Sequence, residues 1–126
     1  MKKKAVRTKN APSPIGAYSQ AIKCGNLVFL SGQIPIDPNT TELVSDKIND
    51  QIEQVFNNVS GVIAEAGGAW ENIVKITIYL KDLEHFDLVN TFMNNLFSKP
   101  FPARAIVEVN DLPKQALIEV DAIMIL

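Results

Sequence analysis

The residues of this chain best suited to chemistry are one arginine and several carboxylates near its end. Arg104, Glu108, Glu119 and Asp121 occur within residues 101–123, in two segments of alternating character. An arginine can hold a planar carboxylate through two parallel hydrogen bonds. A carboxyl group with a shifted pKa can position a water molecule and exchange protons with it. Such a pair suits a small carboxylic acid whose neighbouring carbon is hydrated, but an interface ion pair between Arg104 and Glu119 or Glu108 explains the same residues equally well.

Two strands are expected to carry these groups, joined by a turn at residues 110–114. Because successive side chains of a strand point to opposite faces, Arg104 shares a face with Ile106, and Glu119 shares one with Asp121. The intervening aliphatic residues of each strand are expected to face the core. The alternation therefore predicts a guanidinium and carboxylates close together on one sheet surface.

The rest of the chain supplies the elements that must position these groups. In order, we expect a short edge strand at 5–9, a hairpin of strands at 17–22 and 27–31, a helix at 46–66, a strand at 73–81, a second helix from Phe86 to Phe97, and the two strands described above. The continuous apolar run at 27–30 favours a strand covered on both faces. Polar residues of the first helix, Asn58 among them, are expected to face solvent.

This order of elements predicts an α+β fold, with two helices on one face of a mixed, mostly antiparallel sheet. With 126 residues, one domain spanning residues 1–126 is the natural count. We expect the helices to cover one face of the sheet and to leave the face with Arg104 and Glu119 open. That face also carries aliphatic residues such as Ile106 and Ile123. We therefore expect oligomerisation through it, with Arg104 and Glu119 at or near a subunit boundary.

Several classes of chemistry lack their usual residues in this sequence. It contains no phosphate-binding loop, no dinucleotide-binding glycine motif and no G-x-S-x-G nucleophile motif. His85 is the single histidine and Cys24 the single cysteine, so a dedicated zinc site would be short of ligands. Both are interpreted as structural or surface residues. We expect chemistry without a metal, a cofactor or a conventional nucleophile.

Composition and charge narrow the choice of partners. The formal net charge is -2, so no overall basic field favours nucleic acid, and the basic cluster Lys2–Lys4 is interpreted as a solvated terminus. No apolar run approaches the about 20 residues needed to span a membrane, and no signal-peptide pattern is present. We expect a cytoplasmic protein without membrane or nucleic-acid partners.

Several motifs in register resemble those of the RidA (YjgF-type) family. They are G-A-Y-S-Q at 16–20, L-S-G-Q-I-P at 30–35, V-N at 89–90, F-P-A-R at 101–104, L-P-K at 112–114 and I-E-V-D-A-I at 118–123. The resemblance implies a chorismate-mutase-like α+β fold and a homotrimer with clefts between subunits. It also implies hydrolysis of reactive 2-imino and enamine acids (2-aminoacrylate, 2-iminopropanoate, 2-iminobutanoate) to 2-oxo acids and ammonia, a form of metabolite damage control that needs no cofactor.

The same resemblance assigns roles to individual residues. Arg104 would hold the substrate carboxylate, and Glu119 would orient or activate the attacking water. The substrate-binding residues would be Tyr18, Ser31, Gly32, Asn90, Arg104, Ile106 and Pro113. Many members of the family have a cysteine at the position of Ile106. An aliphatic side chain there excludes a thiol-based side activity and is expected to leave the deaminase activity intact.

Two other functions remain open at this stage. The first is a non-catalytic, metabolite-binding regulatory protein; relatives of that kind typically lack the arginine, which is present here as Arg104. The second is a translation inhibitor or endoribonuclease, as some relatives have been described. The sequence gives this second hypothesis little support, because the net charge is acidic, there is one histidine, and no basic surface with interleaved aromatic residues is indicated.

Overall fold

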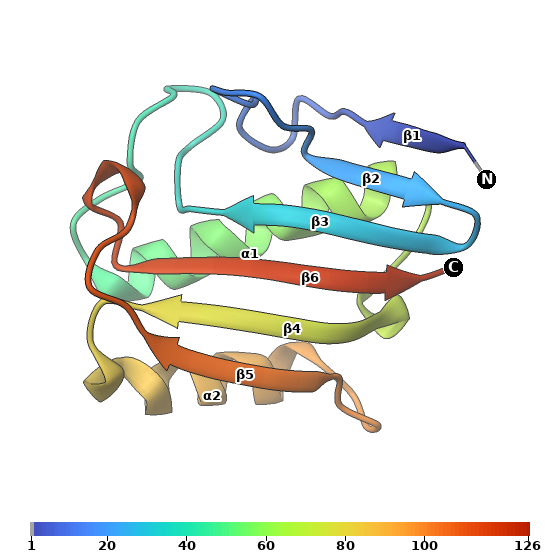
Figure 1. The fold of residues 1–126 in the computed structure, drawn as a ribbon. Coiled ribbons are helices and arrows are strands. Elements are labelled where there is room, and N and C mark those ends of the chain that lie inside the picture. Colours follow the sequence, from blue (N-terminus) through green and yellow to red (C-terminus); the bar gives the residue numbers. More distant parts are fainter. Residues whose placement is uncertain (1) are drawn as a thin grey trace.

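The computed structural model describes residues 2–126 and shows a six-stranded sheet with two helices on one face (Figure 1). The strand order is β1-β2-β3-β6-β4-β5, in which β4 and β5 are parallel and all other neighbours are antiparallel. The elements are β1 (Lys3–Val6), β2 (Ala21–Cys24), β3 (Leu27–Gln33), α1 (Ile48–Glu65), β4 (Ile73–Leu80), α2 (Phe86–Leu96), β5 (Ala103–Glu108) and β6 (Ile118–Ile125). The predicted α+β class and mixed sheet are confirmed.

The apolar stripe of α1 forms the centre of the core. Ile52, Val55, Val59, Val62 and Ile63 are at most 2% exposed, as their three- and four-residue spacing predicts. They pack on β6 and β3, and the alternating core residues of β6 and β4 are also almost fully buried. Period-2 and period-3.6 patterns were sufficient to identify α1, β4 and β6.

Buried amides on α1 depart from the expected solvated helix face. Asn58 is fully buried, and its Nδ2 donates hydrogen bonds to the carbonyl oxygens of Ile34 and Ile36 at 3.1 and 2.9 Å. The prediction that Asn58 faces solvent is therefore wrong. These two carbonyl groups, in the segment after β3, accept no hydrogen bond from a neighbouring strand. The Asn58 amide supplies the donors, so its burial leaves no polar group unpaired.

A second buried amide, Gln20, shapes the segment before β2. Its Oε1 accepts from the backbone N–H of Thr8, and its Nε2 donates to the carbonyl oxygens of Thr8, Ala11 and Pro12. This ring of bonds keeps residues 8–20 in a loop around one side chain. As a result the first hairpin strand begins at Ala21 rather than at 17, and the edge strand β1 ends at Val6 rather than at 9.

The order of the last strands corrects the predicted placement of Arg104. β5 and β6 do not pair, because β4 lies between them. Arg104 is in register with Ile76 of β4, which is buried beneath the helices, so Arg104 points to the helix side of the sheet. Glu119 is in register with Tyr79, on the opposite, open face. Arg104 and Glu119 of one chain therefore do not share a face.

The reason for this error lies in the connection between β4 and β5. The two strands run in parallel with α2 as their crossover, so α2 returns over the edge strand β5 and covers the face that carries Arg104 and Ile106. The aliphatic residues expected in the core, such as Val107, lie instead on the open face, where Val107 is 41% exposed. Alternation along an edge strand does not reveal which face is covered.

The open face of the sheet carries exposed apolar residues. Leu27, Phe29 and Ile125 lie toward one end of it and Val107 lies toward the other, and each is between 37% and 45% exposed. The prediction that the apolar run at 27–30 is covered on both faces is wrong within one chain, because only Val28 and Leu30 are buried. None of the helices in residues 2–126 is both long and apolar enough to cross a membrane.

Candidate functional site

Arg104 is held by the flank of α2. Its Nη1 donates to Oδ1 of Asn90 at 2.7 Å and approaches the Met93 sulfur at 3.8 Å. The guanidinium carbon lies 5.4 Å from the centre of the Phe86 ring, within range of a cation–π interaction. These contacts orient the planar group, while the side chain remains exposed along a hollow of about 430 Å³ bordered by Asn90, Met93, Phe101 and Pro102.

Arg104 has no carboxylate partner among the described residues, whose single ion pair joins Lys81 and Asp111 at 3.2 Å. Arg104 thus pairs with neither Glu119 nor Glu108 within residues 2–126, and the interface ion pair that the sequence leaves open stays a prediction. Most of the guanidinium donors remain available, because the amide of Asn90 engages one nitrogen only. A planar anion could bind to the remaining fork.

Glu119 lies on β6 beside a close approach of the β3 backbone. A Cβ atom added to Gly32 would clash with Oε2 of Glu119. The pairing of β3 with β6 shifts register between Leu30 and Gln33, which is where Gly32 lies. Burial raises the pKa of the Glu119 carboxyl, and the nearby charge of Asp121 raises it further. The carboxylate is thus a stronger base than an exposed glutamate.

A second hollow, of about 330 Å³, opens next to Gly32. Tyr18 and Lys114 border it on its polar side, and its apolar wall consists of Pro12, Ile15, Ile34, Ile36 and Pro38. The Tyr18 hydroxyl oxygen accepts from the backbone N–H of Ile15 at 3.4 Å, and the Ser31 hydroxyl donates to the Ser19 carbonyl oxygen. The first bond lies within the loop organised by Gln20, and the second connects this loop to the end of β3.

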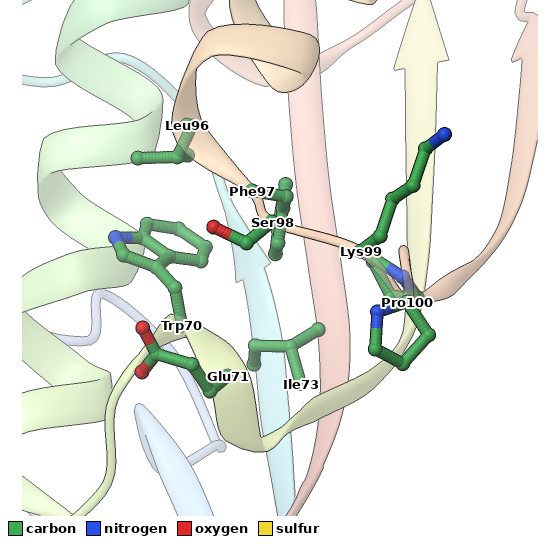
Figure 2. Close-up of a pocket in the computed structure, with 9 residues that line it drawn as sticks. Trp70, Glu71, Ile73, Leu96, Phe97, Ser98, Lys99 and Pro100 are labelled. Carbon is green, nitrogen blue, oxygen red and sulfur yellow. The ribbon is translucent and has the colours of Figure 1, made fainter.

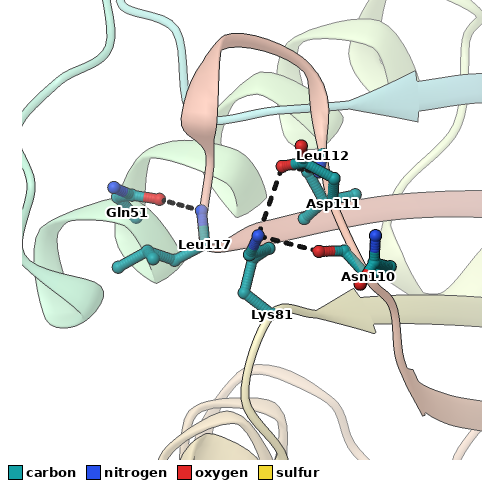
Figure 3. Close-up of polar contacts among 6 residues, drawn as sticks. All are labelled: Gln51, Lys81, Asn110, Asp111, Leu112 and Leu117. Atoms are coloured by element: carbon teal, nitrogen blue, oxygen red, sulfur yellow. Dashed lines mark hydrogen bonds and ion pairs between the residues drawn. The ribbon is translucent and has the colours of Figure 1, made fainter.

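The connection between β5 and β6 is fixed at both ends near this hollow (Figure 3). Nζ of Lys81 donates to the carbonyl oxygen of Asn110 and pairs with Asp111, and Oε1 of Gln51 accepts from the backbone N–H of Leu117 at 2.8 Å. The connection holds Lys114 at a φ of 59°, in the left-handed region. Lys114 was not a predicted site residue, and a strained backbone at a non-glycine residue has no signature in the sequence.

The predicted site residues therefore form two separate groups. Tyr18, Ser31, Gly32 and Glu119 lie together around β3 and β6, and Asn90 and Arg104 lie together between α2 and β5. The groups are on opposite faces of the sheet, and β6 and β5 are two strand spacings, about 10 Å, apart. One small molecule cannot touch both groups of the same chain.

Two predicted residues belong to neither group. Ile106 packs against the core on the helix side, next to Arg104 along β5. Pro113 is exposed beside Lys114, which takes the expected place at the edge of the hollow.

A third, smaller hollow lies between Trp70 and the segment that joins α2 to β5 (Figure 2). Its volume is about 100 Å³, and it contains none of the predicted residues. Within residues 2–126 no three His, Cys, Asp or Glu side chains are grouped so that they could hold a metal ion.

Comparison with known proteins places these features in a family. The family described as "Endoribonuclease L-PSP" matches residues 8–126, nearly the whole chain. The chain is 48% identical to a RutC family protein of Pyrococcus abyssi, over 98% of this chain and 97% of that one. It is 40% identical to a protein of Dermatophagoides farinae named 2-iminobutanoate/2-iminopropanoate deaminase, over 98% and 97% of the two chains. The chain belongs to the RidA family.

Solved structures of RidA-family proteins share the fold closely. RidA from an Antarctic Psychrobacter superposes with a TM-score of 0.94 at 40% identity, covering 98% of this chain and 99% of that one. Escherichia coli TdcF with bound serine gives a TM-score of 0.89 at 35% identity, with 98% of each chain covered. The relative named 2-iminobutanoate/2-iminopropanoate deaminase and one of Arabidopsis thaliana named Reactive Intermediate Deaminase A indicate a deaminase within the RidA family.

Substitution of Gly32 tests how closely this RidA-family site is fitted around Glu119. We expect Gly32→Ala to lower the catalytic rate by about 10²-fold, because the new methyl group would displace the carboxylate by an ångström or more. The fold should persist, since the displaced atoms are the end of a side chain. Gly16→Ala is the matched control, because its added Cβ would be 3.6 Å from the Tyr18 ring, an ordinary contact. Equal rates for the two variants would contradict the expectation.

The perturbed carboxyl of Glu119 is also expected to affect stability. A carboxyl group whose pKa is raised by folding stabilises the folded state most at a pH below its unfolded pKa, about 4.3 for glutamate. That contribution is lost as the pH rises through the higher folded pKa, as it does for Glu119. Glu119→Gln should therefore unfold at a higher temperature than the wild type at pH 7, and this advantage should shrink below about pH 4.

Thermal unfolding followed by circular dichroism at both pH values measures this difference. Glu53→Gln on the exposed face of α1 is the control and should leave the unfolding midpoint unchanged. A Glu119→Gln midpoint below that of the wild type at pH 7 would show that the ionised carboxylate stabilises the fold.

Proposed function

We propose that this protein hydrolyses small 2-imino and enamine acids without a cofactor. In the reaction, R–C(=NH)–COO⁻ and water give R–C(=O)–COO⁻ and ammonia. The observation that carries the proposal is the Arg104 guanidinium, oriented by Asn90 and Phe86 at the edge of a hollow and free of any carboxylate partner in residues 2–126. A substrate carboxylate supplies the planar anion that this fork is built to hold. The naming of relatives as imine deaminases supports the same reaction.

Each of the two groups of residues performs one part of this reaction. Arg104 binds the carboxylate and thereby fixes the neighbouring imine carbon in space, which makes the attack of water effectively intramolecular. Glu119 takes a proton from that water as its oxygen bonds to the imine carbon and gives the proton to the nitrogen, which leaves a hydroxyl and an amino group on the carbon. It then takes the hydroxyl proton as the carbonyl forms and passes it to the nitrogen, so that the carbon–nitrogen bond breaks and ammonia leaves. A basic carboxylate is suited to both steps, and positioned proton transfer of this kind typically contributes about 10²- to 10⁴-fold.

The active site forms between neighbouring subunits in this proposal. Arg104 lies at the β5 edge of the sheet and Glu119 lies on the open face, so an edge of one subunit against the open face of the next brings them together. A contact between two different surfaces closes into a ring when the rotation allows it, and a homotrimer is the ring that the RidA resemblance implies. The exposed Leu27, Phe29 and Ile125 on the open face support burial by a neighbour.

The remaining predicted residues surround the substrate in this arrangement. Tyr18 and Gly32 form the wall on the side of Glu119, with Ser31 next to Gly32 in β3, and Asn90 holds Arg104. The apolar wall formed by Ile34 and Ile36 receives the group R of the substrate. Serine bound to the related TdcF supports a ligand of this size. Ile106, packed beside Arg104, contributes no reactive group.

Imines generated in the cuvette provide the direct test. An amino acid oxidase or a dehydratase releases 2-iminopropanoate or 2-aminoacrylate, and the formation of 2-oxo acid and ammonia is followed with and without this protein. We expect hydrolysis well above the spontaneous rate. Folded, assembled protein that binds 2-oxo acids but leaves the spontaneous rate unchanged would favour a regulatory binding protein instead. Cleavage of RNA that persists in Arg104→Ala and Glu119→Ala variants would favour the endoribonuclease.

A further inference from the structure

A hydrogen-bonded pair of side chains lies next to Glu119 on the open face of the sheet. Asp121 is two residues along β6 and therefore on the same face, and Tyr79 of β4 is the cross-strand partner of Glu119. The Tyr79 hydroxyl donates to Oδ2 of Asp121 at 2.9 Å rather than to Glu119. All three side chains are partly buried. The tyrosine thus bridges diagonally from the position facing Glu119 to the carboxylate beside it.

No other charged side chain of the sheet adjoins Glu119 as closely within the described part of the chain. On the β3 side its neighbours are Ser31 and Gly32, which are neutral. From β4, Tyr79, Thr77 and Lys75 lie on this face, and Lys75 is in register with Ile123, beyond Asp121. From β5, Ala105 and Val107 lie on it. Lys114 lies at the edge of the hollow next to Gly32. Both helices lie on the other face. Asp121 is therefore the charge that the fold places beside Glu119.

We propose that Asp121, oriented by Tyr79, is a positioning residue that keeps Glu119 a strong base for the attack of water on the imine carbon. This inference rests on the proposed function. A negative charge one position along the same face disfavours a second negative charge, so Glu119 holds a proton more tightly once it has taken it from water. The pKa of Glu119 is raised accordingly, first by burial and then by the charge of Asp121.

Tyr79 has a separate part in this arrangement. By donating to Asp121 it holds that carboxylate toward β4, which leaves Glu119 free for water. The bond to Asp121 is the first cause of the raised pKa of Tyr79, which keeps the phenol protonated as a donor. Asp121 and Tyr79 thus act on the reaction only through Glu119.

Asp121→Asn is the decisive variant, because asparagine retains an oxygen that can accept from Tyr79 and removes only the charge. Titration of Glu119 is followed by carbon-13 NMR of labelled glutamate in the assembled protein without substrate, and the pH–rate profile of imine hydrolysis is measured in parallel. We expect the Glu119 midpoint and the acid limb of the profile to move together to lower pH. The plateau rate should fall by less than about 10²-fold, because the base itself remains in place.

Three further variants complete the test. Glu53→Gln removes an exposed charge from α1 and should change neither measurement. Asp121→Glu retains the negative charge at this position and should keep the wild-type pH–rate profile. Tyr79→Phe frees the Asp121 carboxylate to approach Glu119, where its charge further disfavours the ionised form of Glu119, and should move the Glu119 titration to higher pH. A Glu119 midpoint that stays at its wild-type value in both Asp121→Asn and Tyr79→Phe overturns the inference. The titration decides this even if no variant hydrolyses imines, an outcome that would refute the proposed function separately.

Discussion

Replacing Arg104 by alanine is expected to lower kcat/KM for 2-imino acids by about 10²- to 10⁴-fold. Two hydrogen bonds from a charged donor, each worth about 1.5–3 kcal/mol, are lost with the guanidinium, and about 1.4 kcal/mol corresponds to a tenfold change in rate. Arg104→Lys retains the charge but not the planar fork, so we expect a large loss there too. Steady-state kinetics with imines generated in the cuvette measures both effects.

The fold should tolerate this substitution. The Arg104 side chain is exposed, and its removal forfeits the bond to Asn90 and a cation–π contact worth about 0.5–1 kcal/mol. Lys99→Ala is the matched control, since it removes an exposed cation from the segment just before β5. Wild-type kcat/KM in Arg104→Ala, with the oligomer intact, would eliminate Arg104 as the group that binds the carboxylate.

Mixing two inactive variants is expected to restore activity. If each active site takes Arg104 from one subunit and Glu119 from its neighbour, a one-to-one mixture of Arg104→Ala and Glu119→Ala chains contains sites with both intact groups. Random assembly of a ring gives one half times one half, so about one quarter of the wild-type turnover should return. Coexpressed chains that carry the same tag, purified together so that all compositions of the ring are kept, provide the sample.

The controls for this experiment are the two variants alone, each of which should remain inactive at the same total concentration. Native mass spectrometry establishes that mixed rings have formed. Mixed rings without recovered turnover would show that both groups act from the same chain, which the separation across the sheet argues against.

The fold class could be predicted from the sequence because its strongest patterns belong to the most buried elements. The stripe of α1 and the alternation of β4 and β6 both describe surfaces that the core covers completely. The pairing of strands could not be predicted in the same way. Adjacent strands in sequence suggest a hairpin, but whether β4 inserts between β5 and β6 depends on contacts between segments distant in the chain.

The candidate site could likewise be predicted only in part. Motifs in register identified Arg104 and Glu119, whereas their faces depended on the path of α2 over β5, which local alternation does not encode. Buried amides such as Gln20 and Asn58 were equally hidden, because their roles depend on carbonyl groups that tertiary folding brings to them. Lys114 was missed because the position of its loop depends on hydrogen bonds to Lys81 and Gln51, which are distant in the sequence.

The placement of Arg104 and Glu119 on opposite faces of one sheet has a kinetic consequence under the proposed mechanism. A newly made, isolated chain would possess both groups yet no catalytic power, so activity would begin only when chains meet. Turnover per chain would then decline on dilution, with a steepness set by the dissociation of the assembly. For an enzyme that removes reactive metabolites, protection of the cell would depend on its concentration more steeply than in simple proportion.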